Sequence, residues 1–131
     1  MIGYVTIGTN DPERTLPYYD ALLAEIGAKR IMEFPEGSFT MWGTGWDQPG
    51  LVVTRPYNGE PATAGNGNMV ALAVDSRDTV ERVHTRALEL GGTDEGAPGL
   101  RGPEAMGFYA GYFRDPEGNK LAVFTVPTPG G

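Results

Sequence analysis

The sequence lacks cysteine altogether and contains a single histidine, His84. The absence of cysteine excludes disulfide bonds, thiolate nucleophiles and zinc sites built from cysteine, and it fits a reducing compartment. One histidine also excludes a metal site made of two histidines and one carboxylate. The chain is therefore poor in the side chains that most often bind catalytic transition metals.

Basic residues and long apolar runs are also scarce. Ten lysines and arginines face 17 acidic residues, which gives a formal net charge of −7. A nucleic-acid partner requires a basic face, so none is expected. No apolar run approaches the roughly 20 residues of a membrane span, and the chain enters a strand pattern at Ile2 without the features of a signal peptide. We therefore expect a cytoplasmic protein with no membrane partner.

The chain of 131 residues is 40% hydrophobic, which suffices for one domain with a core. Residues 2 to 9 alternate as in a strand. Asp11 is a plausible N-cap for a helix that starts at Pro12 and ends before Gly27, with either a kink at Pro17 or a start nearer Thr15. Strands are then predicted over residues 29 to 34, 39 to 43 and 51 to 57.

The same pattern returns after a connector of glycine, proline and alanine over residues 58 to 68. A strand is predicted over residues 69 to 75, followed by a helix that Ser76 or Asp75 can cap and that Gly91 ends. Aligning Tyr4 with Met69 gives an offset of 65, and aligning residues 51 to 56 with residues 121 to 126 gives an offset of 70. The sequence therefore predicts a duplicated βαβββ unit.

The clearest hairpin lies between residues 108 and 126. Residues 115 to 119 read Asp-Pro-Glu-Gly-Asn, the composition of a turn. If paired residues sum to about 234, then Tyr112 shares a face with Ala110, Ala122 and Phe124, whereas Phe113, Leu121 and Val123 face the helix. The segment from 94 to 107 is predicted to be a long loop, either a lid or a plain connection.

Residues 113 to 122 read Phe-Arg-Asp-Pro-Glu-Gly-Asn-Lys-Leu-Ala and resemble the last hairpin of the vicinal oxygen chelate superfamily, which commonly reads F-x-D-P-[DE]-G-N-x-[LI]-E. This superfamily contains glyoxalase I, extradiol dioxygenases and bleomycin-resistance proteins. The resemblance implies an α+β fold of two tandem βαβββ modules with curled mixed sheets around a shared cleft. It implies one glyoxalase-like domain over residues 1–131, with module one at about 1–57, the linker at 58–68 and module two at about 69–127.

The resemblance also places four metal-ligand positions, one on the first and one on the last strand of each module. They fall on Tyr4, Val52, Met69 and Ala122, and the register at Val52 could slip to Val53. A catalytic divalent ion needs about three imidazole, carboxylate or thiolate ligands. None of the four residues is a good ligand, so we expect neither metal nor cofactor.

The predicted cleft is largely apolar, and its candidate residues are of three kinds. Tyr4 and Tyr112 are candidate catalytic residues, because a phenol can orient a substrate or donate a proton. Arg55 and Arg101 could clamp a carboxylate or could be solvated surface residues. The full set of candidate ligand contacts is Tyr4, Thr6, Trp42, Trp46, Arg55, Met69, Arg101, Tyr112 and Phe124. The alternative is that the apolar members belong to an ordinary core. His84 is expected to border the apolar stripe of its helix, partly exposed.

Two hypotheses about function follow, and a third is kept beside them. The first is a metal-free protein that binds a small organic molecule, similar to the bleomycin-resistance branch, for which net acidity favours a cationic ligand. The second is a glyoxalase-like lyase or isomerase that acts on a small carbonyl compound or glutathione adduct by tyrosine and arginine acid-base chemistry. The third is a module that only dimerises or binds another protein. A homodimer is expected because the superfamily usually forms one.

Overall fold

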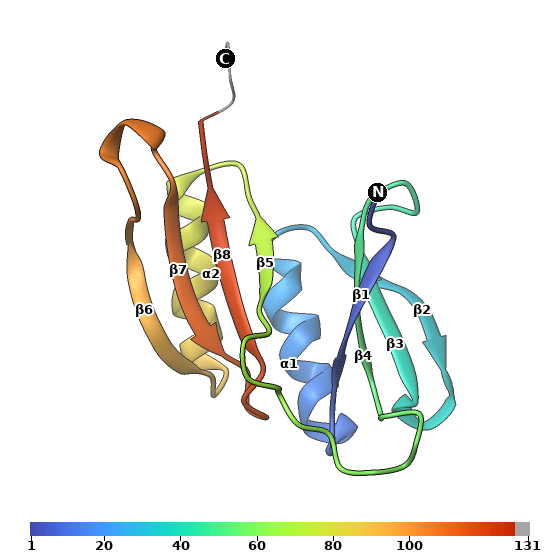
Figure 1. The fold of residues 1–131 in the computed structure, drawn as a ribbon. Helices are drawn as coiled ribbons and strands as arrows, with labels where there is room; N and C mark the ends of the chain where they lie inside the picture. The colour runs from blue at the N-terminus through green and yellow to red at the C-terminus, as the bar shows by residue number, and fades with distance from the viewer. Residues whose placement is uncertain (128–131) are drawn as a thin grey trace. The chain divides into compact units, whose positions relative to one another are not determined.

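The computed structural model describes residues 1–127, which form two compact units (Figure 1). Unit 1 consists of Met1–Asn68 together with Glu117–Asn119, and unit 2 consists of Met69–Pro116 together with the residues from Lys120 onward. Each unit contains one helix and one four-stranded sheet. No helix in the described part of the chain is long and apolar enough to cross a membrane.

Unit 1 is a βαβββ unit. Its elements are β1 (Tyr4–Gly8), α1 (Pro12–Ala24), β2 (Lys29–Phe34), the short helix η1 (Pro35–Gly37), β3 (Phe39–Gly43) and β4 (Gly50–Thr54). The strands lie in the order β1-β4-β3-β2, so that the first strand pairs in parallel with the last. The remaining pairs are antiparallel, which makes the sheet mixed.

The start of α1 differs in detail from the sequence prediction. The helix begins at Pro12 and retains Pro17, which lies exposed in its second turn, so a later start near Thr15 is wrong. Asp11 occupies the N-cap position, but its side chain makes no capping hydrogen bond. The Glu117 carboxylate reaches this end of the helix and accepts hydrogen bonds from the Asn10 N–H at 2.5 Å and from the Thr15 hydroxyl at 2.6 Å. A side chain remote in sequence therefore caps α1.

The core of unit 1 lies between its sheet and α1. Trp42 from β3 is 1% exposed and its ring lies 5.8 Å from that of Tyr19 on the helix. Its indole Nε1–H donates to Asp20 at 3.0 Å. Arg30 contacts both, with its guanidinium 2.7 Å from the Asp20 carboxylate and 5.7 Å from the centre of the Trp42 ring. These contacts fix which face of β3 is turned to the helix.

Unit 2 repeats the same order of elements. They are β5 (Val70–Ala73), α2 (Arg77–Glu89), β6 (Thr93–Leu100), the short helix η2 (Glu104–Met106), β7 (Tyr109–Arg114) and β8 (Lys120–Thr125). The strand order is β5-β8-β7-β6, with β5 parallel to β8. Ser76 caps α2, because its hydroxyl accepts from the Thr79 N–H at 3.1 Å. The prediction of one long loop over residues 94 to 107 is wrong in its first half, which forms β6 and pairs with β7.

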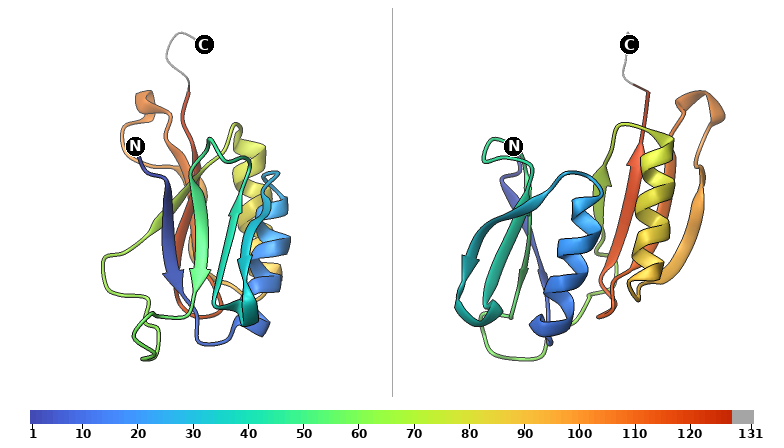
Figure 2. Two further views of the ribbon diagram at one scale, coloured as in Figure 1. Left: turned by 90° about the vertical axis from the view of Figure 1, so that its right-hand side faces the viewer. Right: turned by 180° about the vertical axis from the view of Figure 1, so that it is seen from behind.

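The helix side of unit 2 is built around Phe113 and His84. Helix α2 covers one face of the strands β6 to β8, as the view from behind in Figure 2 shows. Phe113 is fully buried, with its ring 6.4 Å from His84. His84 is only 6% exposed, which corrects the expectation of partial exposure. Its Nε2 lies 3.0 Å from the Asp94 carboxylate and 3.2 Å from the Tyr112 carbonyl. Because both neighbours are acceptors, Nε2 carries the proton and donates.

The internal repeat predicted from the sequence is confirmed by the strand registers. Thr6 lies opposite Val52 in unit 1, and Ala71 lies opposite Ala122 in unit 2. These two pairs are related by the offsets of 65 and 70 found in the sequence. The α+β fold with two βαβββ modules is therefore the one the sequence predicts.

Candidate functional site

In unit 2, the sheet face that α2 does not cover carries the most distinctive set of side chains. The register of the hairpin pairs Tyr112 with Ala122, as the parity argument predicted. Side chains alternate between the two faces of a strand, so the residues opposite the helix are known. We call this surface the unit-2 face. It comprises Ala71, Ala73, Ala110, Tyr112, Arg114, Lys120, Ala122 and Phe124, with Phe108 and Arg101 lying against it.

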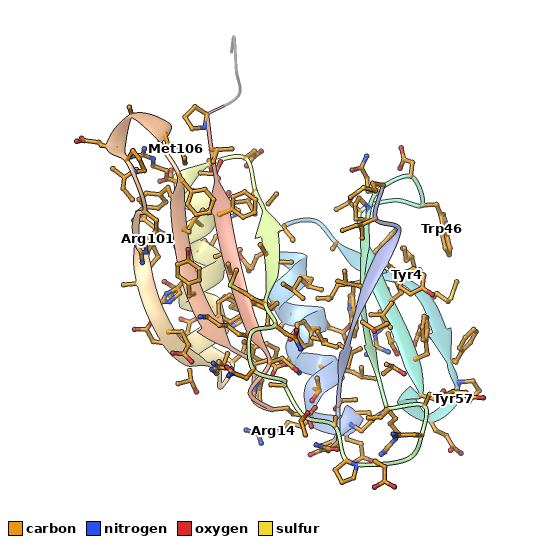
Figure 3. All side chains as sticks on the ribbon, viewed as in Figure 1. Tyr4, Arg14, Trp46, Tyr57, Arg101 and Met106 are labelled. Atoms are coloured by element: carbon orange, nitrogen blue, oxygen red, sulfur yellow. The ribbon has the colours of Figure 1, made fainter. Side chains whose placement is uncertain are left out.

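Tyr112 on the central strand β7 lies between two cations. The Arg101 guanidinium carbon is 5.4 Å from the centre of the Tyr112 ring, and the Lys120 ammonium is 5.7 Å from the same centre. Arg101 follows β6 on one side of β7, and Lys120 begins β8 on the other side. Figure 3 labels Arg101 at the β6 edge of the sheet. Both distances are within the range of cation–π attraction.

The position of Arg101 is fixed by the backbone of β6. Its guanidinium donates to the Ala97 carbonyl at 2.6 Å and to the Leu100 carbonyl at 3.3 Å. Gly99 makes room for it, since an added Cβ there would lie 2.9 Å from Arg101 Nη1, whereas an added Cβ at Gly96 would lie 3.1 Å from Tyr112 Cδ2. The guanidinium is therefore held in place before any ligand arrives.

The other end of the unit-2 face is apolar. The Phe108 and Phe124 rings stack with their centres 5.2 Å apart. Ala71 and Ala73 on the edge strand β5 are exposed, so their methyl groups lie in contact with solvent. The face thus combines a charged end at Tyr112 with an aromatic end at Phe124.

The corresponding face of unit 1, opposite α1, is largely aromatic, and the strand register adds the exposed Lys29 at its edge. Tyr4 is 54% exposed, and its ring lies 6.2 Å from that of Phe39. Phe39 in turn lies 5.3 Å from Phe34, which is 52% exposed. We call this surface the unit-1 face; Thr6 on β1 is exposed on the same side as Tyr4.

Three other predicted contacts lie apart from these clusters. Trp42 is a core residue on the helix side of its sheet, which corrects its prediction as a ligand contact. Trp46, in the loop between β3 and β4, is 70% exposed and is labelled in Figure 3. Arg55 lies just beyond the end of β4 and is exposed, and Met69, 46% exposed, precedes β5.

The four positions at which the resemblance placed metal ligands offer poor donors. Val52 and Ala122 are hydrocarbon side chains with exposed fractions of 0% and 1%, and Met69 offers only a thioether. Tyr4 alone carries an oxygen. Within residues 1–127 there is no group of three or more His, Cys, Asp or Glu side chains that could hold a metal ion. The donor set therefore does not fit the divalent ion of the superfamily.

The polar residues of the hairpin motif have a structural role in unit 1. Burial disfavours the charged form of Glu117, but hydrogen bonds from the Thr15 and Thr9 hydroxyls and from the Asn10 and Asp11 N–H groups outweigh it and lower its pKa. Asn119 is 6% exposed and donates to the Gly8 carbonyl at 3.0 Å. The motif thus secures the end of β1 and the start of α1.

Sequence reasoning missed Phe108, Arg114 and Lys120 on the unit-2 face. Lys120 has the same parity as Ala122 and Phe124, so the hairpin register predicted for those residues also placed its ammonium on their side. Phe108 precedes β7, and no periodicity indicated that it would stack on Phe124. The role of Gly99 beside Arg101 could not be predicted, because β6 was predicted as a loop.

Comparison with known proteins agrees with this geometry. The sequence model of the Glyoxalase/Bleomycin resistance protein/Dioxygenase superfamily matches residues 1–123. The chain belongs to this superfamily. A glyoxalase/bleomycin resistance protein from Albidiferax ferrireducens T118 is 32% identical, with 97% of this chain and 99% of that chain covered and a TM-score of 0.84. A search of curated proteins found no match.

More distant structures share the fold of this superfamily member. A glyoxalase/bleomycin resistance protein/dioxygenase family enzyme from Burkholderia phytofirmans PsJN is 22% identical, with a TM-score of 0.75 over 95% of this chain and 98% of that one. A lactoylglutathione lyase from Agrobacterium tumefaciens is also 22% identical, with a TM-score of 0.68 over 95% of this chain and 92% of that one.

Proposed function

We propose that this superfamily member binds a small organic molecule on the unit-2 face, without a divalent metal at the superfamily's ligand positions. The observation that carries the proposal is the environment of Tyr112, an aromatic ring on a central strand with a fixed guanidinium beside it. Stacked aromatic rings and exposed methyl groups continue the surface toward Phe124. Small-molecule sites typically combine such an apolar lining with a few placed polar groups.

The donor chemistry of the four family positions supports binding without metal. Replacing the glutamate of the family motif by Ala122 removes a carboxylate from the middle of β8, and Val52 at the matching position of β4 is equally unable to coordinate. The remaining predicted contacts, Tyr4, Thr6, Trp46, Arg55 and Met69, stay predictions.

The first experiment tests the metal. The untagged protein is analysed for Ni, Zn, Mn, Fe and Co as purified, and again after incubation with each ion and desalting. The proposal predicts substoichiometric metal throughout. Stoichiometric retention of any of these ions would contradict it and would redirect attention to isomerase and dioxygenase assays.

The second experiment tests ligand binding. A thermal-shift screen compares aromatic, cationic and glutathione-like compounds, since a ligand that binds only the folded protein raises its melting temperature. Two variants, Phe124→Ala on the unit-2 face and Tyr57→Ala at a fully exposed aromatic residue, test whether binding depends on this surface. Loss of the shift in the first variant alone is the expected result.

A glyoxalase-like lyase or isomerase is the second candidate, because Tyr112 presents a phenol beside Arg101. The phenol can donate a proton and the guanidinium can polarise a carbonyl oxygen. The test is an assay with the hemithioacetal of methylglyoxal and glutathione. Turnover that Tyr112→Phe abolishes would favour catalysis over binding, whereas no turnover leaves binding as the function.

A further inference from the structure

Within the described residues the two cations at Tyr112 have no acidic partner, a state that they share with Lys29 and Arg55 but not with three of the arginines. Arg30 is paired with Asp20 and Glu33, Arg86 with Glu89, and Arg114 with Glu95. By contrast, within residues 1–127 neither Arg101 nor Lys120 forms an ion pair with a carboxylate. This is notable in a protein with a net charge of −7, where acidic groups outnumber basic ones.

Arg101 is held in a way that leaves it able to bind an anion. Two of its N–H groups donate to the Ala97 and Leu100 carbonyls, and the others have no protein acceptor in the described part of the chain. A guanidinium already fixed by its own backbone loses little conformational entropy when a carboxylate binds. Because Gly99 leaves space for the guanidinium and two β6 carbonyls bind it, the position of Arg101 is set by the fold of β6.

The spacing along β8 defines the shape of the complementary ligand. Lys120, Ala122 and Phe124 project from the same side of the strand. At about 3.3 Å per residue, the charged end lies roughly 13 Å from the aromatic end. The buried methyl group of Ala122 forms the floor between them. A ligand that fits this surface carries a negative charge at one end and a flat apolar body at the other.

We propose that the unit-2 face recognises aromatic carboxylates, with the carboxylate held by Arg101 beside Tyr112, Lys120 adding positive charge nearby, and the ring system lying toward Phe124. This inference rests on the proposed ligand-binding function and names the chemical class of its ligand. It also corrects the expectation, drawn from net acidity, that the ligand is cationic. Local charge within a few ångströms outweighs distant surface charge, which salt screens beyond about 10 Å.

The test uses two probes of nearly the same shape, 2-naphthoate and the neutral 2-naphthalenemethanol, in calorimetric titrations of the full chain. We expect 2-naphthoate to bind more tightly and to weaken as salt is added. We expect Arg101→Gln to reduce its affinity about tenfold or more, since hydrogen bonds to charged groups are the stronger kind. Lys120→Gln is expected to give a smaller loss. Lys29→Gln, an exposed cation on β2, serves as the matched control and is expected to change nothing.

The neutral probe separates a loss of charge recognition from a loss of structure. Unchanged binding of 2-naphthalenemethanol by Arg101→Gln shows that the face is intact, and an equal loss for both probes overturns the charge assignment. If the two probes bind wild-type protein equally, the inference fails and the proposed function survives. If neither binds, the inference fails as well, and the thermal-shift screen then decides the proposed function independently.

Discussion

The open faces of the two units, built on the same βαβββ scaffold, carry different chemistry. The unit-1 face presents the Tyr4, Phe39 and Phe34 rings, and within the described residues no cation lies over any of them. The unit-2 face presents Tyr112 with Arg101 and Lys120 over its ring. The two units share their strand order and register, whereas the side chains on the faces opposite the helices differ.

On the helix sides, in contrast, the two units contain the same kind of contact, made by different residues. In unit 1 the Trp42 Nε1–H donates to Asp20 at 3.0 Å, and in unit 2 the His84 Nε2 lies 3.0 Å from Asp94. Each places a buried aromatic N–H against a carboxylate near the surface, which satisfies the donor. Such a pairing keeps a polar ring in the core without an unsatisfied hydrogen bond.

The largest loss of stability is expected from a substitution on the helix side of unit 1. Trp42→Ala removes a fully buried ring and should lower the free energy of unfolding by about 3–5 kcal/mol. Trp42→Phe, which mainly removes the N–H donor, should cost far less because Asp20 is partly exposed and water can replace the bond. Urea unfolding followed by circular dichroism measures both. Trp46→Ala is the control, and a change beyond about 0.5 kcal/mol there would argue against the burial assignment.

The cap that Glu117 provides to α1 has no equivalent in unit 2, where Ser76 caps its own helix. Glu117→Gln should destabilise the protein by about 1–2 kcal/mol at neutral pH. The folded pKa of Glu117 lies below its ordinary 4.5, so its charge stabilises the fold above that pH and the contribution is lost as pH falls through the folded pKa.

The difference in free energy of unfolding between wild type and Glu117→Gln should therefore become smaller in acid. Urea titrations at about pH 7 and about pH 3 measure this narrowing. Glu60→Gln in the exposed connector serves as the control. If this difference in free energy of unfolding stays constant or grows in acid, the Glu117 charge is not what stabilises the start of α1.

The position of Arg101 can be disturbed without touching its charge. Gly99→Ala places a Cβ within 2.9 Å of Arg101 Nη1, so the guanidinium must shift away from Tyr112. We expect affinity for 2-naphthoate to fall about fivefold, near 1 kcal/mol, with little loss of stability because the flexible end of a side chain yields. Gly3→Ala, where an added Cβ meets nothing within 4 Å, is the control. Unchanged affinity in Gly99→Ala would mean that binding does not depend on the position in which the Ala97 and Leu100 carbonyls hold the Arg101 guanidinium.

The smallest effect is expected on the unit-1 face. Tyr4→Phe keeps the ring and removes only a hydroxyl from a half-exposed residue, so stability should change by less than about 0.5 kcal/mol. Any affinity for aromatic probes should be nearly unchanged in titrations. A large loss of affinity or turnover would instead support the role of Tyr4 as a proton donor.

Much of the fold follows from sequence pattern, because alternation and turn chemistry are local. The residues of β2 and β3 and the pairing of Tyr112 with Ala122 were predicted as observed. The prediction failed where tertiary contacts override local preference. Glycine and proline made β6 resemble a loop, although pairing with β7 holds it as a strand. Trp42 was predicted as a ligand contact, but its indole lies on the helix side of β3, where it contacts Asp20 and Arg30.

The candidate site was only partly predictable for the same reason. Arg101 and Tyr112 were singled out separately, yet nothing in the sequence joins them, since their contact depends on the carbonyls of β6. The lack of good ligands at the four family positions could be inferred from the motif alignment and the single histidine, because it depends on residue type and needs no geometry.

The Glu117 cap sets an order for folding during synthesis. Thr15 and the Glu117 carboxylate that it contacts are 102 positions apart, and Asn119 reaches Gly8 across 111 positions. A ribosome releases the chain from its N-terminus, so α1 emerges long before the residue that secures its first turn. The first turn of α1 therefore lacks this cap until the last hairpin of the chain has been made.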